Sequence, residues 1–175
     1  MKPNMAAVVM AVITLSGQAQ TPSDSTLSAL EFRDRISIGE LINAYAHDAD
    51  RRETRKQTDL FTDNATMEIY HQEPGTRKPD TVLRGRGELY TGFATLKKYD
   101  VTMHFIGQST IHLFGDSATG EVYCLAHHIW EENGKRQLMV MGLRYYDTYI
   151  KLDNKWLFAK RILIFDWVDT RYSLP

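Results

Sequence analysis

The chain has 175 residues and a mass of 20.1 kDa, which is enough for one domain with a sizeable hydrophobic core. Hydrophobic residues make up 43% and charged residues 25%, a composition that excludes general disorder. The formal net charge of −1 gives no electrostatic reason to expect a nucleic-acid partner. The single cysteine excludes an internal disulfide and a cysteine-rich zinc site.

The N-terminal residues differ in character from the rest of the chain. A lysine at position 2 precedes an apolar run over 5–15 (MAAVVMAVITL), which small residues follow up to Ala19. This order is typical of a secretory signal peptide, and the run is too short for a stable membrane span. We therefore predict a signal peptide over 1–19, a flexible leader over 20–27, and export to the periplasm or the medium. An N-terminal helix or tail is the alternative.

The first helix is predicted over residues 28–52, because apolar residues recur there at three- and four-residue spacing. These residues are Ile36, Ile38, Leu41, Ile42, Tyr45 and Ala49. The charged run over 51–56 (RRETRK) is most simply a solvated connection. A second, short helix is predicted over 57–61, and residues 62–64 are predicted to end it.

A hairpin and a third helix are predicted next. Residues 65–70 and 81–84 are predicted to pair as strands around a loop over 71–79, which contains two prolines and a glycine. The third helix is predicted over 88–97. Four long antiparallel strands then complete the chain, over 101–114, 118–131, 137–150 and 155–168.

Clear turn signals separate these four strands. They are Gly115-Asp116-Ser117, Asn133-Gly134 and Asp153-Asn154, and Asn-Gly is the strongest short hairpin signal. Helices on one side of an antiparallel sheet define an α+β fold, and long strands twist and coil. We predict one domain over 28–170: a cone-shaped barrel of a strongly curved, mostly antiparallel sheet, closed by three N-terminal helices around one small-molecule pocket.

Two histidines are candidates to face that pocket. His104 lies within one predicted strand, and His128 lies late in the next. Adjacent strand residues point to opposite faces, so every second residue from Val122 to His128 shares one face. These residues before His128 are small or apolar, so we predict that this face lines the pocket and that His128 faces it instead of His127. His112 shares the alternation of His104 but lies roughly 26 Å farther along the strand, too far for one site. The alternative for a single buried histidine is a purely structural, hydrogen-bonded role.

Asp48 and Asp50 end the first predicted helix, where a negative charge opposes the helix dipole and suggests a specific use. Their directions differ by about 200°, so we expect only one to face the pocket. An aspartate that faces a histidine there would form a general acid–base pair, able to run an elimination, an isomerisation or a ring closure without a cofactor.

Other chemistries find little support in the sequence. It contains no GxSxG elbow and no HExxH motif, and Gly85-Arg86-Gly87 is not a dinucleotide-binding loop. We therefore expect no cofactor and no metal. Four tyrosines are candidates to donate a hydrogen bond to a substrate: Tyr45, Tyr70, Tyr145 and Tyr146. Core or rim packing is the alternative for each of them. Of these we select Tyr45, Tyr70 and Tyr146.

Four segments together resemble the SnoaL-like branch of the nuclear-transport-factor-2-like (NTF2-like) superfamily. They are 42–51 (INAYAHDADR), 60–65 (LFTDNA), 83–88 (LRGRGE) and 104–107 (HFIG). Within that branch the chain is most similar to the scytalone dehydratases and the lindane dehydrochlorinases. The resemblance spans roughly residues 30–168, and it rests on the order and spacing of the segments.

The resemblance implies roles for particular residues. Asp50 matches the catalytic acid, His104 the base, His128 the second histidine and Tyr70 a substrate contact. The longer charged run after Asp50 leaves Asp48 as an alternative. The resemblance also implies a homodimer or a homotrimer.

We therefore predict a cofactor-independent lyase of the dehydratase type, or an isomerase, that uses a His–Asp pair on a small, largely apolar cyclic or polyketide-like molecule. The alternative is a non-catalytic protein that binds a small ligand with the same fold. In both cases the expected partner is a small organic molecule.

Overall fold

The computed structural model describes residues 28–173. The predicted signal peptide over 1–19 and the predicted leader over 20–27 lie outside the described residues. The helices are α1 (Ala29–Asp50), α2 (Thr54–Asp59), α3 (Gly85–Ala94) and the short 3-10 helix η1 (Thr95–Lys98). The strands are β1 (Phe61–Tyr70), β2 (Thr81–Arg84), β3 (Val101–Phe114), β4 (Ser117–Glu132), β5 (Lys135–Leu152) and β6 (Lys155–Tyr172).

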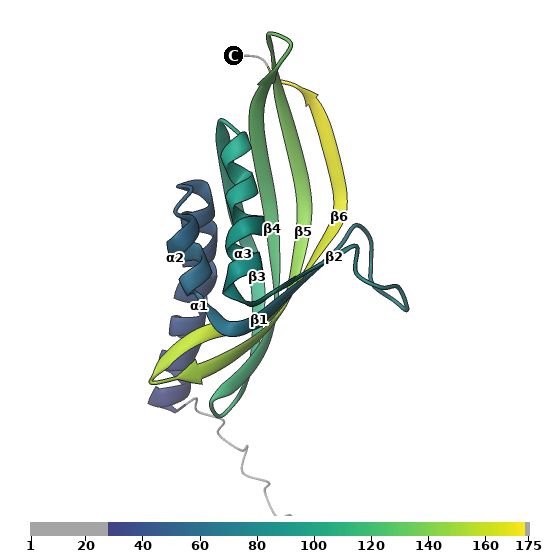
Figure 1. Ribbon diagram of the computed structural model, residues 1–175. Coiled ribbons are helices and arrows are strands. Elements are labelled where there is room, and N and C mark those ends of the chain that lie inside the picture. The colour runs from purple at the N-terminus through teal and green to yellow at the C-terminus, as the bar shows by residue number, and fades with distance from the viewer. Residues whose placement is uncertain (1–27, 174–175) are drawn as a thin grey trace, which may run out of the picture.

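The six strands form one curved sheet in the order β2-β1-β6-β5-β4-β3. Only the β1–β6 pair is parallel, and the other pairs are antiparallel. Figure 1 shows α1, α2 and α3 together on the concave side of this sheet. The α+β prediction is therefore confirmed, with one refinement. The edge strands β2 and β3 do not pair, so the sheet is an open cone and not a closed barrel.

Helix α1 begins with a capping box. The Ser28 hydroxyl accepts a hydrogen bond from the Glu31 amide, and the Glu31 carboxylate accepts one from the Ser28 amide. The buried face of α1 runs from Ile38 to Ala49. Ile36, which was predicted on that face, is 46% exposed, because the N-terminal part of the helix extends beyond the core.

Several boundaries differ from the predictions, and β6, for example, ends at Tyr172 instead of residue 168. Helix α2 occupies Thr54–Asp59 instead of 57–61, and α3 with η1 occupies 85–98 instead of 88–97. Residues 62–64, predicted as a helix end, already belong to β1. The pairing of β1 with β6 shifts register between Phe61 and Thr66, so a bulge accommodates these polar residues within the strand.

The predicted hairpin turns are confirmed. Asn133 and Gly134 have φ values of 54° and 70°, and Asp153 and Asn154 have values of 48° and 61°. Two consecutive residues with positive φ match the right-handed twist of the flanking strands, which is why Asn, Asp and Gly occupy these turns. Within residues 28–173, no helix is long and apolar enough to cross a membrane.

A fully buried ion pair lies on the concave side of the sheet, next to α1. Arg161 donates to both carboxylate oxygens of Asp147, at 2.7 and 2.8 Å, and the Tyr149 hydroxyl donates to the same carboxylate at 2.9 Å. The Arg161 guanidinium lies 4.1 Å from the ring centres of both Tyr45 and Tyr145. Paired charge and aromatic faces together allow a cation to remain in the core.

Candidate functional site

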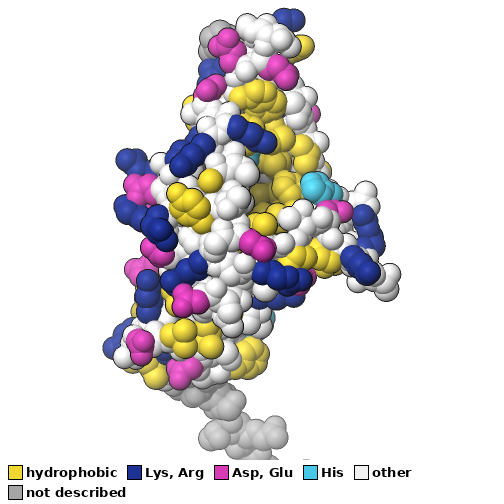
Figure 2. All heavy atoms as spheres, in the orientation of Figure 1, with side chains coloured by type: hydrophobic (Ala, Val, Ile, Leu, Met, Phe, Trp, Pro, Cys, Tyr) yellow, Lys and Arg dark blue, Asp and Glu magenta, His cyan; other side chains and the backbone are white. Residues whose placement is uncertain are grey.

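A cavity of about 720 Å³ lies between the concave face of the sheet and helices α1 and α3. Hydrophobic side chains form much of its wall, among them Met67, Phe93, Met141, Leu143, Leu163 and Phe165. In Figure 2 the visible face of the molecule has a hollow in which hydrophobic side chains, coloured yellow, gather. A space of this size and character suits a small, largely apolar molecule.

Asp50 and His104 meet at one end of this cavity. The Asp50 Oδ1 atom lies 2.7 Å from His104 Nδ1, and Asp50 Oδ2 accepts a hydrogen bond from the His104 backbone amide at 2.8 Å. The His104 side chain lines the cavity and is only 8% exposed. Because Nδ1 is taken by the carboxylate, Nε2 is the ring nitrogen that remains for a molecule in the cavity.

The local structure explains how the carboxylate reaches the histidine. Asp50 is the last residue of α1, and His104 lies on the edge strand β3, which packs beside that helix end. Asp48, the alternative acid, instead lies 3.3 Å from His47 Nδ1. The structure therefore brings Asp50 to His104, in the pairing that the resemblance implies.

Two further residues support the Asp50 carboxylate. The Thr102 hydroxyl donates to Asp50 Oδ1 at 3.0 Å, and Arg52 Nη1 donates to the Thr102 hydroxyl at 2.7 Å. Arg52 also donates to the carbonyls of Asp50 and Tyr99, at 2.6 and 3.1 Å. Arg52 has a φ of 61°, which is unusual for a residue with a side chain. The segment read as a solvated connection therefore contributes a half-buried arginine to the site.

These contacts keep Asp50 ionised. Burial raises the pKa of the Asp50 carboxyl. The hydrogen bonds and charge of His104 and the hydrogen bond from Thr102 together lower this pKa by more than burial raises it, so it lies below its ordinary value. A carboxylate that stays charged accepts the Nδ1 proton of the histidine and stabilises the imidazolium that forms when Nε2 takes up a proton.

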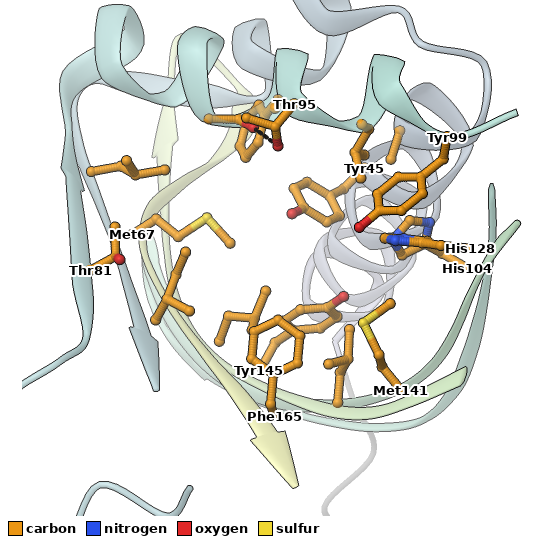
Figure 3. Close-up of a pocket in the computed structure, with 18 of the residues that line it drawn as sticks. Tyr45, Met67, Thr81, Thr95, Tyr99, His104, His128, Met141, Tyr145 and Phe165 are labelled. Atoms are coloured by element: carbon orange, nitrogen blue, oxygen red, sulfur yellow. Dashed lines mark hydrogen bonds between the residues drawn. The ribbon is translucent and has the colours of Figure 1, made fainter. Parts of the chain in front are cut away.

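His128 lies beside this pair. Its ring centre is 5.6 Å from that of His104 and 4.3 Å from that of Tyr99, and all three residues line the cavity (Figure 3). Burial, and next the charges of His104 and Arg52, lower the pKa of His128 to about 4. Neither ring nitrogen has a hydrogen-bond partner within residues 28–173. His128 is therefore a neutral ring with unused hydrogen-bonding capacity at the polar end of the cavity.

Of the three selected tyrosines, Tyr45 lines the cavity and the other two do not. Tyr45 lines the cavity, together with Tyr145 and Tyr99. Tyr70 and Tyr146 do not line it: the Tyr70 hydroxyl donates to Glu68, and the Tyr146 hydroxyl accepts from Arg144. Adjacent strand residues point to opposite faces, so Met67 and Ile69 face the cavity and Tyr70 does not, and Tyr145 takes the place predicted for Tyr146.

Some residues of the site were not predicted. Thr102 has the same alternation as His104, so it could have been found from the sequence. Arg52 gives no such signal, because its position depends on the left-handed turn after α1. His112 is exposed, and a bulge in β3 between Ile106 and Ser109 turns it away from the face that carries His104.

A nucleophilic cysteine and a metal centre are two other kinds of catalytic site. Burial raises the pKa of the Cys124 thiol to about 11, so it is a weak nucleophile. In the described part of the chain, no three His, Cys, Asp or Glu side chains gather as they would around a metal ion.

Comparisons with known proteins agree with this fold. A family model described as a SnoaL-like domain matches residues 30–162. An uncharacterized protein of Mycobacterium tuberculosis is 24% identical over 140 residues, which cover 79% of this chain and 89% of that protein.

Solved structures share the fold at lower identity. A candidate scytalone dehydratase from Novosphingobium aromaticivorans superposes with a TM-score of 0.68 and 18% identity, over 82% of this chain and 91% of that one. A hexachlorocyclohexane dehydrochlorinase gives a TM-score of 0.66 and 16% identity, over 82% and 92% of the two chains. These likenesses concern the fold alone, whereas the family match covers most of the domain. The chain belongs to the SnoaL-like domain family.

Proposed function

We propose that this protein is a cofactor-independent lyase of the dehydratase type, or an isomerase, that acts on a small, largely apolar cyclic molecule. The observation that carries the proposal is the Asp50–His104 pair at the end of an apolar cavity, with Nδ1 held at 2.7 Å and Nε2 left for a ligand. Two solved structures with this fold are named for a dehydratase and a dehydrochlorinase, which supports an elimination.

In the proposed reaction His104 Nε2 removes a proton from a carbon next to a carbonyl group. The electron pair of the broken C–H bond forms a C=C bond, and the C–O bond to a neighbouring hydroxyl group breaks. The protonated His104 then returns its proton to the departing oxygen, so water leaves and the ring is neutral again. Asp50 stabilises the imidazolium in between, and an isomerisation would return the proton to another carbon instead.

The apolar wall assists this chemistry. It excludes water from the substrate, so the charge pair of Asp50 and His104 is stronger than it would be in solvent. The neutral ring of His128 lies 5.6 Å from the ring of His104, and Tyr99 lies beside His128, so both can contact a carbonyl oxygen of a bound molecule. We assign them to substrate binding, together with Tyr45.

The test is incubation of the protein with a panel of cyclic hydroxy-ketones, followed by mass spectrometry for loss of water and NMR for isomerisation. Activity of the unmodified protein should disappear in His104→Gln and Asp50→Asn. His47→Gln is the matched control, because His47 also pairs with an aspartate but does not line the cavity. Full activity of His104→Gln on a confirmed substrate would refute the proposal. A ligand that binds tightly and is recovered unchanged would favour the alternative, a binding protein.

We also propose that the protein acts after export, as the N-terminal residues predict. The intact mass of the protein recovered from the periplasm or the medium tests this proposal. A mass that corresponds to cleavage after Ala19 is expected, and a full-length cytoplasmic product would contradict it.

A further inference from the structure

A second histidine–aspartate pair belongs to the same cavity. His71 lines the cavity, and its Nδ1 atom lies 3.1 Å from Asp80 Oδ2. The same oxygen accepts the His71 backbone amide at 2.8 Å. Asp50 likewise accepts both the backbone amide and Nδ1 of His104. The two pairs therefore repeat one arrangement, in which a carboxylate binds its histidine twice and leaves Nε2 for a ligand.

The two pairs lie at opposite edges of the cavity. His71 follows the last residue of β1, and His104 lies on β3, which is four strands away in the order of the sheet. Four strand spacings correspond to roughly 19 Å across the strands, measured along the curved sheet. The His71 side chain is 63% exposed and that of His104 is 8% exposed. His71 therefore lies at the rim and His104 at the buried end.

The His71 ring is held in one orientation. It stacks on Phe165 with a centroid distance of 4.9 Å and an interplanar angle of 6°. Phe165 itself lines the cavity, so the His71 ring extends an aromatic wall to the rim. An exposed His–Asp pair contributes little to stability, so stability alone does not account for an ordered ring at this position. A ligand that meets this ring would lose little free energy in ordering it.

The hydrogen bond at Nδ1 of His71 also determines whether Nε2 of this ring donates or accepts a hydrogen bond. With the Nδ1 proton directed at a carboxylate, the neutral ring carries a lone pair on Nε2 and accepts a hydrogen bond there. The wall between the two ends is apolar, with Leu143, Leu163 and Phe165 lining it. A matching ligand carries one polar group at the buried end, a hydrophobic middle, and a hydrogen-bond donor at the rim.

We propose that His71 is a specificity-determining residue that accepts a hydrogen bond from a hydroxyl group at the outer end of the substrate. The substrate class is then an elongated, flat, hydrophobic molecule with oxygen functions at both ends. This inference rests on the proposed function for the buried end, and it adds the second point of recognition.

Two biphenyl probes test the inference by binding alone. One carries a single para hydroxyl group, and the other carries a para hydroxyl group on each ring. The single hydroxyl should occupy the buried end, where hydrogen bonds are stronger. Isothermal titration calorimetry should show that the unmodified protein binds the dihydroxy probe about fivefold more tightly, the effect of one additional hydrogen bond.

The decisive variant is His71→Phe, because phenylalanine keeps an aromatic ring that can stack on Phe165 and removes the ring nitrogens. It should abolish the preference for the dihydroxy probe while the monohydroxy probe still binds, and His71→Ala should also lose the preference. His47→Phe is the control, since His47 is similarly exposed and paired but does not line the cavity. Circular dichroism checks that each variant is folded.

The inference is overturned if the unmodified protein binds both probes equally or binds neither, or if His71→Phe keeps the preference. These outcomes are independent of turnover. If His104→Gln abolishes turnover while His71→Phe keeps the preference, the proposed function stands and the inference fails. If His71→Phe loses the preference while no hydroxy-ketone is converted, the rim site stands and the catalytic proposal fails.

Discussion

The neutral state of His128 should make the stability of this protein depend on pH. The side chain is 6% exposed, and within residues 28–173 its ring nitrogens have no hydrogen-bond partner. Burial, followed by the charges of His104 and Arg52, lowers its pKa from 6.5 to about 4. Between these two pKa values, the unfolded chain therefore binds a proton at His128 and the folded protein does not.

The sign and the size follow from linkage. Below a pH of about 6.5 the unfolded chain binds the proton and the folded protein does not, so the free energy of unfolding falls with the pH until the folded pKa is reached. A pKa lowered from 6.5 to about 4 corresponds to a loss of roughly 3 kcal/mol. About 2 kcal/mol of this loss should occur between a pH of about 7.5 and a pH of about 5.

Urea unfolding at these two pH values measures the effect. The difference between the unmodified protein and His128→Gln isolates His128, because the other titrating groups are present in both. The unmodified protein should lose about 2 kcal/mol more than His128→Gln when the pH is lowered, and His112→Gln, at an exposed histidine, should behave like the unmodified protein. An equal pH dependence for the unmodified protein and His128→Gln would refute a buried neutral ring.

Three further predictions concern the contacts around the cavity. Asp50→Asn should lower kcat by about 100-fold or more on a confirmed substrate without unfolding the protein, because an amide oxygen still accepts hydrogen bonds but cannot stabilise an imidazolium; near-normal kcat would contradict this role. Thr102→Val should lower kcat by up to about tenfold with little change in KM, because it removes one hydrogen bond that positions the carboxylate; a changed KM alone would indicate a binding role. Asp147→Asn should lower the free energy of unfolding in urea by about 3–5 kcal/mol, because it leaves the Arg161 charge buried without its counter-ion. The double variant Asp147→Leu/Arg161→Met should cost much less, and equal losses would contradict the argument.

Local sequence signals predicted most of the fold. Turn residues such as Asn133-Gly134 defined where the long strands begin and end, since few residues adopt two consecutive positive φ values. The pairing of Asp50 with His104 was implied by the resemblance, and the cost of an acid at a helix C-terminus suggested a specific use for either Asp48 or Asp50. The Arg52 contacts were not predictable, because they require a left-handed backbone at a residue whose sequence context gives no sign of it.

The candidate site also shows where alternation along a strand is a better guide than resemblance. Met67 and Ile69 face the cavity, so alternation directs Tyr70 away and His71 inward, although the resemblance selected Tyr70. The same reasoning applied to β5 selects Tyr145 over Tyr146.

Alternation fails where a strand changes its pairing register, as β3 shows. In β3, Thr102, His104 and Ile106 turn inward, and the bulge before Ser109 reverses the pattern, so that Ile111 is the more buried residue and His112 is exposed. Gly107 lies within this bulge, and a glycine inside a strand is a local sign of one. The glycine does not show how the register changes, because that depends on how two strands pair over their whole length. Inward-facing residues can therefore be read from the sequence between bulges, whereas the register after a bulge requires the structure.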